Sequence, residues 1–149
     1  MENRPTFRIA RSLDDLIKVF IVRGIVFLDE QHVSYREEMD EHEHAAVHIL
    51  GEIDGEPIAA GRIRLLGSFA KLERLAVRRP YRGNGYGDDL MRFVMKVARD
   101  MGFSKFKLNA QVAVRDFYAR HGFQVCGENF IEANIEHCPM IREDANRET

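Results

Sequence analysis

A glycine-rich turn between a predicted strand and a predicted helix constrains the fold of this chain more than any other feature. Residues 72–77 are short, apolar and branched, which favours a strand, and Pro80 ends it. The sequence RGNGYG follows at residues 82–87, and apolar residues then recur at helical spacing up to Met101. Glycines ahead of a helix let backbone N–H groups approach an anion closely, and the helix start adds its own unpaired N–H groups. The stretch therefore predicts a phosphate cradle, with Arg82 as an additional cation.

The spacing of the glycines excludes two common nucleotide-binding loops. A P-loop ends in Gly-Lys-Ser/Thr, and this stretch has no such ending. A dinucleotide-binding fingerprint has glycine at its first, third and sixth positions, but the sixth position counted from Gly83 is Asp88. Two interpretations are left: a phosphate cradle of another type, or a glycine-rich turn that only joins a strand to a helix.

The other segments predict an α/β fold in which helices flank a mixed sheet. Asp54-Gly55 between two apolar runs indicates a hairpin, and Ser12 with Asp15 is typical of a helix start. The strand after the central helix should lie parallel to the strand before it, because a helix connects them. Further strands are expected at residues 6–10, 45–53, 57–66, 106–109, 123–130 and 135–142, and a short helix at 113–121. The first helix is expected to bury the face formed by Leu13, Leu16, Ile17, Phe20, Phe27 and Leu28.

Composition places the chain among ordinary single-domain proteins. Its 149 residues are 45% apolar and 31% charged, so we expect one domain, 1–149, with a substantial core. The net charge of -2 favours neither nucleic acid nor an anionic membrane as a partner. The sequence shows neither a signal-peptide pattern nor an apolar run long enough to span a bilayer. Cys126 and Cys138 are too few for a disulfide framework and are expected in the core, so a cytoplasmic location is predicted.

Two groups of polar residues suggest ligands but have simpler interpretations. His42, His44 and His48 lie in or beside an acidic stretch, yet His44 and His48 would lie far apart on the predicted strand, and no cysteine accompanies them. We therefore expect a solvated acidic loop and no metal. Arg62 and Arg64 share one side of their strand; they are expected to face water, with an anionic substrate as the alternative.

Several motifs together resemble those of the GNAT superfamily of N-acetyltransferases. Arg-Gly-Xaa-Gly-Xaa-Gly after a strand ending in Leu-Ala-Val resembles its pyrophosphate loop, and QVAVRDFYARHGF at 111–123 resembles its closing motif. FIEANIEHCPM at 130–140 and RGIVFLDEQHV at 23–33 resemble the ElaA-like branch of the superfamily. The resemblance covers nearly the whole chain. It implies the acyl-CoA N-acyltransferase fold and transfer of an acetyl group from acetyl-CoA to an amine, by direct attack in a ternary complex.

The resemblance also implies which residues hold acetyl-CoA. Backbone groups on the central strand would bind the pantetheine arm, because family members splay the strand at this point. Gln111 stands where many members have Asn. Asp88 and Asp89 follow the turn, and whether they weaken binding by repelling the pyrophosphate is left open. The expected binding residues are Leu75, Ala76, Val77, Arg82, Gly83, Asn84, Gly85, Tyr86, Gly87, Gln111 and Phe117.

The resemblance assigns Tyr118 as the general acid that protonates the departing thiolate. The alternative for Tyr118 is a core tyrosine that packs beside Phe117. A covalent route through either cysteine is disfavoured, because neither lies in a recognisable activated setting.

The general base has three candidates. An amine with a pKa of about 10.4 is protonated at pH 7 and must lose a proton before or during attack. His137 is the first choice, because histidines take up protons near neutrality. Glu73 is the second: it is expected on the side of the central strand that also carries Leu75 and Val77, and its alternative is a charge paired with Arg62 or Arg64. A chain of water molecules without a single base is the third.

The sequence leaves the acceptor and two rival functions open. A small metabolite amine, a peptide N-terminus and a protein lysine all remain. The acidic stretch at 37–44 suggests a cationic acceptor, whereas the arginine pair at 62 and 64 suggests the opposite. The rivals are a catalytically silent acyl-CoA sensor and a partner-binding domain with an ordinary glycine turn. The oligomeric state is also open, and a homodimer is favoured only because dimers are the commonest oligomers.

Overall fold

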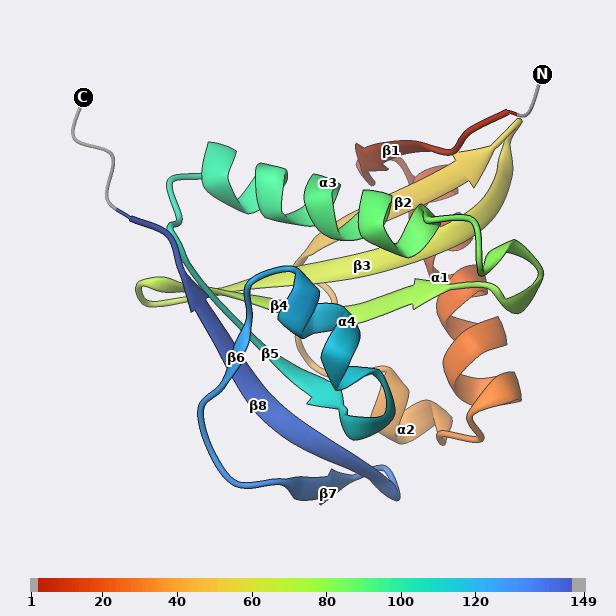
Figure 1. The fold of residues 1–149 in the computed structure, drawn as a ribbon. Helices are drawn as coiled ribbons and strands as arrows, with labels where there is room; N and C mark the ends of the chain where they lie inside the picture. The colour runs from red at the N-terminus through yellow and green to blue at the C-terminus, as the bar shows by residue number, and fades with distance from the viewer. Residues whose placement is uncertain (1–2, 146–149) are drawn as a thin grey trace.

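The computed structural model describes residues 3–145, whose eight strands form one mixed sheet flanked by helices (Figure 1). This confirms the predicted α/β class. The strands are β1 (Thr6–Ile9), β2 (Val47–Ile53), β3 (Glu56–Leu66), β4 (Phe69–Val77), β5 (Lys105–Gln111), β6 (Gln124–Val125), β7 (Phe130–Glu132) and β8 (Ile135–Glu143). The α-helices are α1 (Leu13–Arg23), α2 (Tyr35–Glu38), α3 (Tyr86–Asp100) and α4 (Arg115–Arg120). A π-helical segment, η1 (Gly24–Glu30), continues α1, and 3₁₀ turns lie at Arg79–Tyr81 and Val112–Val114.

The strands follow the order β1-β2-β3-β4-β5-β8-β6, and β7 pairs with β8 outside this path. Strands β1 to β4 are antiparallel neighbours, whereas β4 and β5 are parallel, as the intervening α3 predicts. Asp54 and Gly55 have φ of 49° and 83°, which identifies the tight hairpin turn that their sequence predicts.

The two faces of the sheet are covered by different helices. Helix α3 packs on one face through Leu90, Met91, Val94 and Ala98, as its periodicity predicts, whereas Met101 lies at the helix end and is 42% exposed. Helix α1 covers the opposite face, on which Leu50, Ala60 and Ala76 form its packing surface. Figure 1 shows the sheet between α1 and α3.

The predicted buried face of the first helix is wrong at Leu13 and Ile17, whereas Phe27 does pack against the core. Val19 and Val22 are fully buried and Val26 is 3% exposed, whereas Leu13 and Ile17 are 75% and 49% exposed. The inward face also carries Asp15, whose carboxylate accepts from the Arg8 guanidinium at 2.7 Å, and Arg23, which is described below. Hydrophobic periodicity misplaces this face because ion pairs account for two of its buried positions.

A β-bulge at Arg74 reverses the sides of β4. Arg62 pairs with Glu73 and Ala60 with Ala76, so Arg74 and Leu75 together oppose the single residue Gly61. Arg74 has φ of 54°, in the left-handed region. Glu73 therefore lies on the α1 side of the sheet, while Leu75 and Val77 pack against the core under α3. The expectation that Glu73, Leu75 and Val77 share one side is wrong, because strict alternation does not survive a bulge.

Strands β4 and β5 separate after a short paired region. They pair only at Phe69–Lys105, Ala70–Phe106 and Lys71–Lys107. Beyond this point β5 continues to pair with β8 as far as Gln111 and His137. The sheet therefore forks, and the β5-facing backbone edge of β4 from residue 72 to residue 77 is left without a strand partner.

The predicted strand at 123–130 is wrong, because residues 126–129 separate β6 from β7. The Cys126 N–H donates to the Pro139 carbonyl at 2.9 Å. Pro139 has no N–H to return the bond, so the ladder stops there. A Cβ on Gly127 would lie 2.9 Å from the Pro139 ring. Cys138 is buried, as expected, but Cys126 is exposed.

Candidate active site

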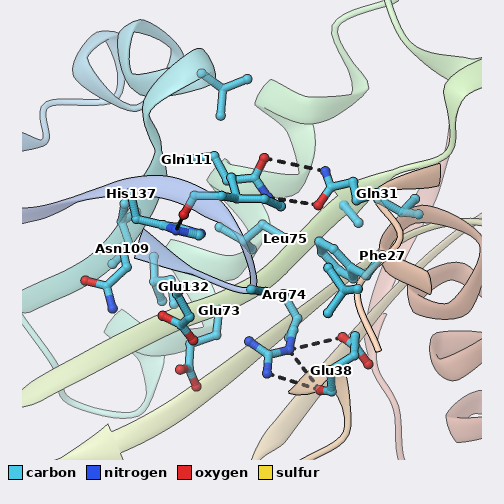
Figure 2. A pocket seen from close by; sticks show the side chains of 18 of the residues that line it. Phe27, Gln31, Glu38, Glu73, Arg74, Leu75, Asn109, Gln111, Glu132 and His137 are labelled. Atoms are coloured by element: carbon cyan, nitrogen blue, oxygen red, sulfur yellow. Dashed lines mark hydrogen bonds and ion pairs between the residues drawn. The ribbon is translucent and has the colours of Figure 1, made fainter. Parts of the chain in front are cut away.

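A cavity of about 730 Å³ occupies the fork between β4 and β5 (Figure 2). Its walls come from β4, β5, the segment from η1 to α2, and the β7–β8 hairpin, with Arg82, Val114 and Tyr118 added from the loop before α3, the 3₁₀ turn before α4 and α4 itself. These segments are distant in sequence, and the fork brings them together. The predicted site residues in its wall are Glu73, Leu75, Ala76, Val77, Arg82, Gln111, Tyr118 and His137.

The glycine turn lies just beyond Arg82, at the start of α3. Gly83 and Gly85 have φ of 83° and 81°, which explains why glycine is required at both positions. An added Cβ would meet no atom within 4 Å at either one, so the space in front of the turn is open. Gly85 also caps the N-terminus of the 15-residue α3. The turn thus presents the unpaired N–H groups and the partial positive charge of a long helix.

Phe117 and Tyr86 stand beside this turn and outside the cavity wall. A Cβ on Gly87 would lie 3.4 Å from the Phe117 ring, so α4 approaches the first turn of α3 closely. Tyr86 is 9% exposed and packs in the core under α3. The Asn84 side-chain amide donates to the Tyr81 carbonyl at 3.1 Å, which stabilises the turn itself. All three residues support the shape of the turn.

Arg82, predicted as an additional cation beside the glycine turn, is paired with a carboxylate. Its guanidinium donates to both carboxylate oxygens of Glu30, at 2.7 and 2.9 Å, and to the Val77 carbonyl at 2.8 Å. The hydrogen bond from Arg82 lowers the pKa of the Glu30 carboxyl. Arg82 therefore ties the glycine turn to the end of η1.

Asp88 and Asp89 are each paired with a cation or a histidine from another segment. Asp88 lies 2.8 Å from the Nε2 atom of His121, at the end of α4. Asp89 accepts from the Arg4 guanidinium at 2.8 Å, and Arg4 also lies over the Tyr86 ring. The two carboxylates are thus directed to neighbours on α4 and the N-terminal segment.

Gln111 forms an amide pair with Gln31 across the cavity (Figure 2). The Gln111 Nε2 group donates to the Gln31 Oε1 atom at 2.9 Å, and the reverse contact is 3.5 Å. The pair joins the end of β5 to the end of η1. Gln31 belongs to the RGIVFLDEQHV motif, but no local pattern in that motif places it opposite Gln111.

Tyr118 stands in the cavity wall with its ring packed against aromatic neighbours. Its ring centroid lies 5.1 Å from that of Phe117 and 6.4 Å from that of Phe123, both in edge-to-face geometry. Burial raises the pKa of Tyr118 to about 12. The phenol is therefore neutral near pH 7 and retains a proton that it can donate.

His137 is held in one orientation on β8. Its Nδ1 atom lies 2.7 Å from the Ile135 carbonyl, and because a carbonyl only accepts, Nδ1 carries the hydrogen of the neutral ring. The ring stacks on Phe130, with centroids 5.6 Å apart and an interplanar angle of 16°. This tautomer leaves Nε2 with a lone pair that can accept a proton.

Glu73 is a paired charge. Its carboxylate is 11% exposed and lies 2.9 Å from Arg62, 3.3 Å from Lys71 and 3.6 Å from Arg64. Burial alone would raise the pKa of Glu73, but the neighbouring cations, Arg62 above all, lower it. A carboxylate stabilised in this way is a weak base.

The expectation that Arg62 faces water is wrong. Arg62 is fully buried and donates to both oxygens of Asp40, at 2.8 and 2.9 Å, in addition to its contacts with Glu73 and Glu43. Arg23, also fully buried, lies 3.0 Å from Glu38 and 2.6 Å from Glu43. Most of the acidic stretch therefore folds inward onto arginines, since a buried guanidinium requires carboxylates around it.

Comparison with known proteins settles the family. The family description "acetyltransferase (GNAT) domain" matches residues 21–143. The chain belongs to the GNAT acetyltransferase family. A Bacillus subtilis protein, YjcF, named an uncharacterised N-acetyltransferase, is 41% identical over 137 residues, which is 91% of this GNAT chain and 97% of YjcF.

Solved structures show the same GNAT fold. An acyl-CoA N-acyltransferase from Pseudomonas aeruginosa superposes with a TM-score of 0.84 at 24% identity, over 95% of this chain and 99% of that one. Escherichia coli ElaA superposes with a TM-score of 0.83 at 24% identity, over 95% of this chain and all of ElaA.

His48, beside the acidic stretch of this GNAT protein, has a backbone partner. His48 is buried, and its Nε2 atom lies 2.7 Å from the Glu43 carbonyl. Across residues 3–145, no three His, Cys, Asp or Glu side chains are grouped so as to hold a metal ion. Among the same residues, no helix has both the length and the apolar character needed to cross a membrane.

Proposed function

We propose that this GNAT protein transfers the acetyl group of acetyl-CoA to an amine by direct attack within a ternary complex. The observation that carries the proposal is the fork between β4 and β5, which opens the edge of β4 onto a large cavity. Unpaired strand N–H and C=O groups can bind an extended chain that carries amides, as pantetheine does. The glycine turn and the α3 N-terminus continue this edge and suit a pyrophosphate.

A relative of the same fold supports coenzyme A as the ligand. PaiA N-acetyltransferase from Thermoplasma acidophilum was crystallised in complex with coenzyme A, and it superposes with a TM-score of 0.71 at 15% identity. In the proposed arrangement, the backbone of residues 75–77 binds the pantetheine arm and the amides of residues 83–87 bind the phosphates. Gln111 and Gln31 lie on the opposite side of the cavity.

The chemistry is divided between two side chains and the open strand edge. His137 takes a proton from the acceptor ammonium through Nε2, and the free amine then attacks the thioester carbon. A backbone N–H on the β4 edge stabilises the tetrahedral oxyanion. As the C–S bond breaks, Tyr118 donates its proton to the departing sulfur. The nitrogen of the new N–C bond then gives up its extra proton to the Tyr118 phenolate, which leaves a neutral amide and restores the phenol. Glu73 stays ionised and bound to Arg62 throughout.

Titration calorimetry of the purified protein with acetyl-CoA tests the proposal, with NAD and ATP as controls. Micromolar affinity for acetyl-CoA alone, corresponding to about -8 kcal/mol, is the expected result. An amine panel with release of free thiol as the readout then separates an enzyme from an acyl-CoA sensor, which binds but does not turn over. Absence of acetyl-CoA binding would reject both.

The role of His137 predicts a loss of turnover without a loss of acetyl-CoA affinity. His137→Gln should lower kcat by about 100-fold, because no side chain then takes the proton of the acceptor ammonium. Calorimetry should give the wild-type affinity for acetyl-CoA. His42→Gln, in the acidic loop outside the cavity, is the matched control and should change neither quantity. An unchanged kcat in His137→Gln would instead point to Glu73 or to a water chain.

A further inference from the structure

The β7–β8 hairpin turns one of its faces to the cavity. Glu132 is paired with Ile135, and Phe130 with His137, so all four lie on the same face. Glu132, Ile135 and His137 line the cavity. Glu136, paired with Ile131, lies on the opposite face of the hairpin, and both glutamates are exposed. Glu132 and the proposed base thus lie on the same face of one hairpin.

The cations of the cavity wall are already matched by carboxylates. Lys71 lies 3.3 Å from Glu73, Arg74 lies 3.1 Å from Glu38, and Arg82 lies 2.7 Å from Glu30. Glu132, by contrast, forms no ion pair with any residue from 3 to 145. Figure 2 shows Glu132 with His137 and Asn109 on one side of the cavity, and Arg74 and Glu38 on the other.

The acidic stretch at 37–44 suggests a cationic acceptor and the arginine pair at 62 and 64 an anionic one, and the structure decides between them. Asp40 and Glu43 bind buried arginines, so they are not available to an acceptor, and Arg62 is itself buried. An anionic acceptor would have to break an existing ion pair to find a cation in the wall. A cationic group finds Glu132 without breaking any. Glu37 lines the same cavity and adds charge of the same sign.

We propose that Glu132 binds a second cationic group on the acceptor, so that the substrates are diamines rather than simple monoamines. The proposal rests on the acetyl transfer proposed above. Diagonal neighbours on a hairpin face, such as Glu132 and His137, lie roughly 7–8 Å apart. An amine held at His137 therefore places a second ammonium beside Glu132 when a short alkyl chain separates the two nitrogens. At pH 7 that second amine is charged, because its pKa is about 10.4.

Three acceptors of similar length test the proposal: cadaverine, pentylamine and aminocaproate. They carry a cation, a methyl group and an anion at the far end, respectively. The expected order of kcat/KM is cadaverine, then pentylamine, then aminocaproate, with about a 10-fold advantage of cadaverine over pentylamine. Equal kcat/KM for cadaverine and pentylamine overturns the proposal while leaving the acetyl transfer intact. Failure to acetylate any amine overturns both.

Variants of the hairpin assign the preference to Glu132. Glu132→Gln should raise KM for cadaverine by about 10-fold with little change in kcat, and should leave pentylamine unaffected. Glu132→Lys should reverse the preference in favour of aminocaproate. Glu136→Gln, on the other face of the same hairpin, is the matched control and should keep the wild-type preference. Equal losses for cadaverine and pentylamine in Glu132→Gln would show a structural role and overturn the proposal.

Discussion

Tyr118→Phe should lower kcat by about 100-fold while leaving the affinity for acetyl-CoA unchanged. The substitution removes only the hydroxyl and keeps the ring that packs between Phe117 and Phe123. Burial raises the pKa of Tyr118 to about 12. The same buried surroundings also disfavour a charged thiolate, so the departing sulfur needs a proton donor more than it would in water. Without the hydroxyl, the leaving group is expelled as an unassisted thiolate.

Steady-state rates and calorimetry on the same preparations check this prediction. Tyr35→Phe is the matched control, because Tyr35 is 70% exposed and lies outside the cavity wall. It should behave as wild type in both measurements. A Tyr118→Phe protein with unchanged kcat would show that Tyr118 only packs in the core, and the proton would then come from solvent.

Arg62→Met should destabilise the fold by about 3–5 kcal/mol at pH 7. Arg62 is fully buried and contacts Asp40, Glu43 and Glu73, so its removal leaves three partly buried carboxylates short of a counter-charge. The methionine fills much of the same volume, so the loss reports the charge more than the packing. Denaturant unfolding at constant pH measures the change in the free energy of unfolding.

The pH dependence of this loss has a definite sign. Burial alone would raise the pKa of Asp40 and of Glu43, but hydrogen bonds from Arg62 and Arg23, respectively, lower both to about 2. In the wild type these depressed pKa values stabilise the fold above about pH 4.5, and that stabilisation is lost as the pH falls towards 2. Without Arg62, protonation of these carboxylates removes their uncompensated charge and stabilises the folded variant. The difference in the free energy of unfolding between wild type and Arg62→Met should therefore shrink as the pH falls.

Lys96→Met is the control for this experiment. Lys96 pairs with Asp100 on the surface of α3, with side chains 69% and 64% exposed. Such a pair contributes little, so the free energy of unfolding should not change measurably at any pH. A deficit in Arg62→Met that stayed constant with pH would mean that lost packing, and not uncompensated charge, causes the destabilisation.

Local signals in the sequence predicted the structural elements that surround the site. The hairpin at Asp54-Gly55, the glycine turn before α3 and the end of α3 near Gly102 all follow from backbone preferences of single residues. Ser12 also caps α1, its hydroxyl accepting from the Asp15 N–H at 3.0 Å. The Asp15 side chain, however, turns to Arg8, so even the capping box is only half formed by local contacts.

The positions of the charged residues were decided at longer range. Periodicity places Arg62 on one side of β3 but does not reveal that Asp40, 22 residues away, folds over it. Arg82 belongs to the predicted loop, yet its partner Glu30 lies 52 residues away. The face of α1 was misassigned for the same reason, because buried ion pairs have no hydrophobic signature.

The sequence by itself determined the strand–turn–helix unit, the antiparallel hairpins and the GNAT resemblance, because each depends on residues close together in the chain. Only the tertiary structure decided the bulge at Arg74, the fork after Lys71 and the hairpin face that brings Glu132 beside His137. These features depend on the register between strands and on which charges become buried. Both are set by contacts between segments far apart in sequence, so no local sequence pattern predicts them.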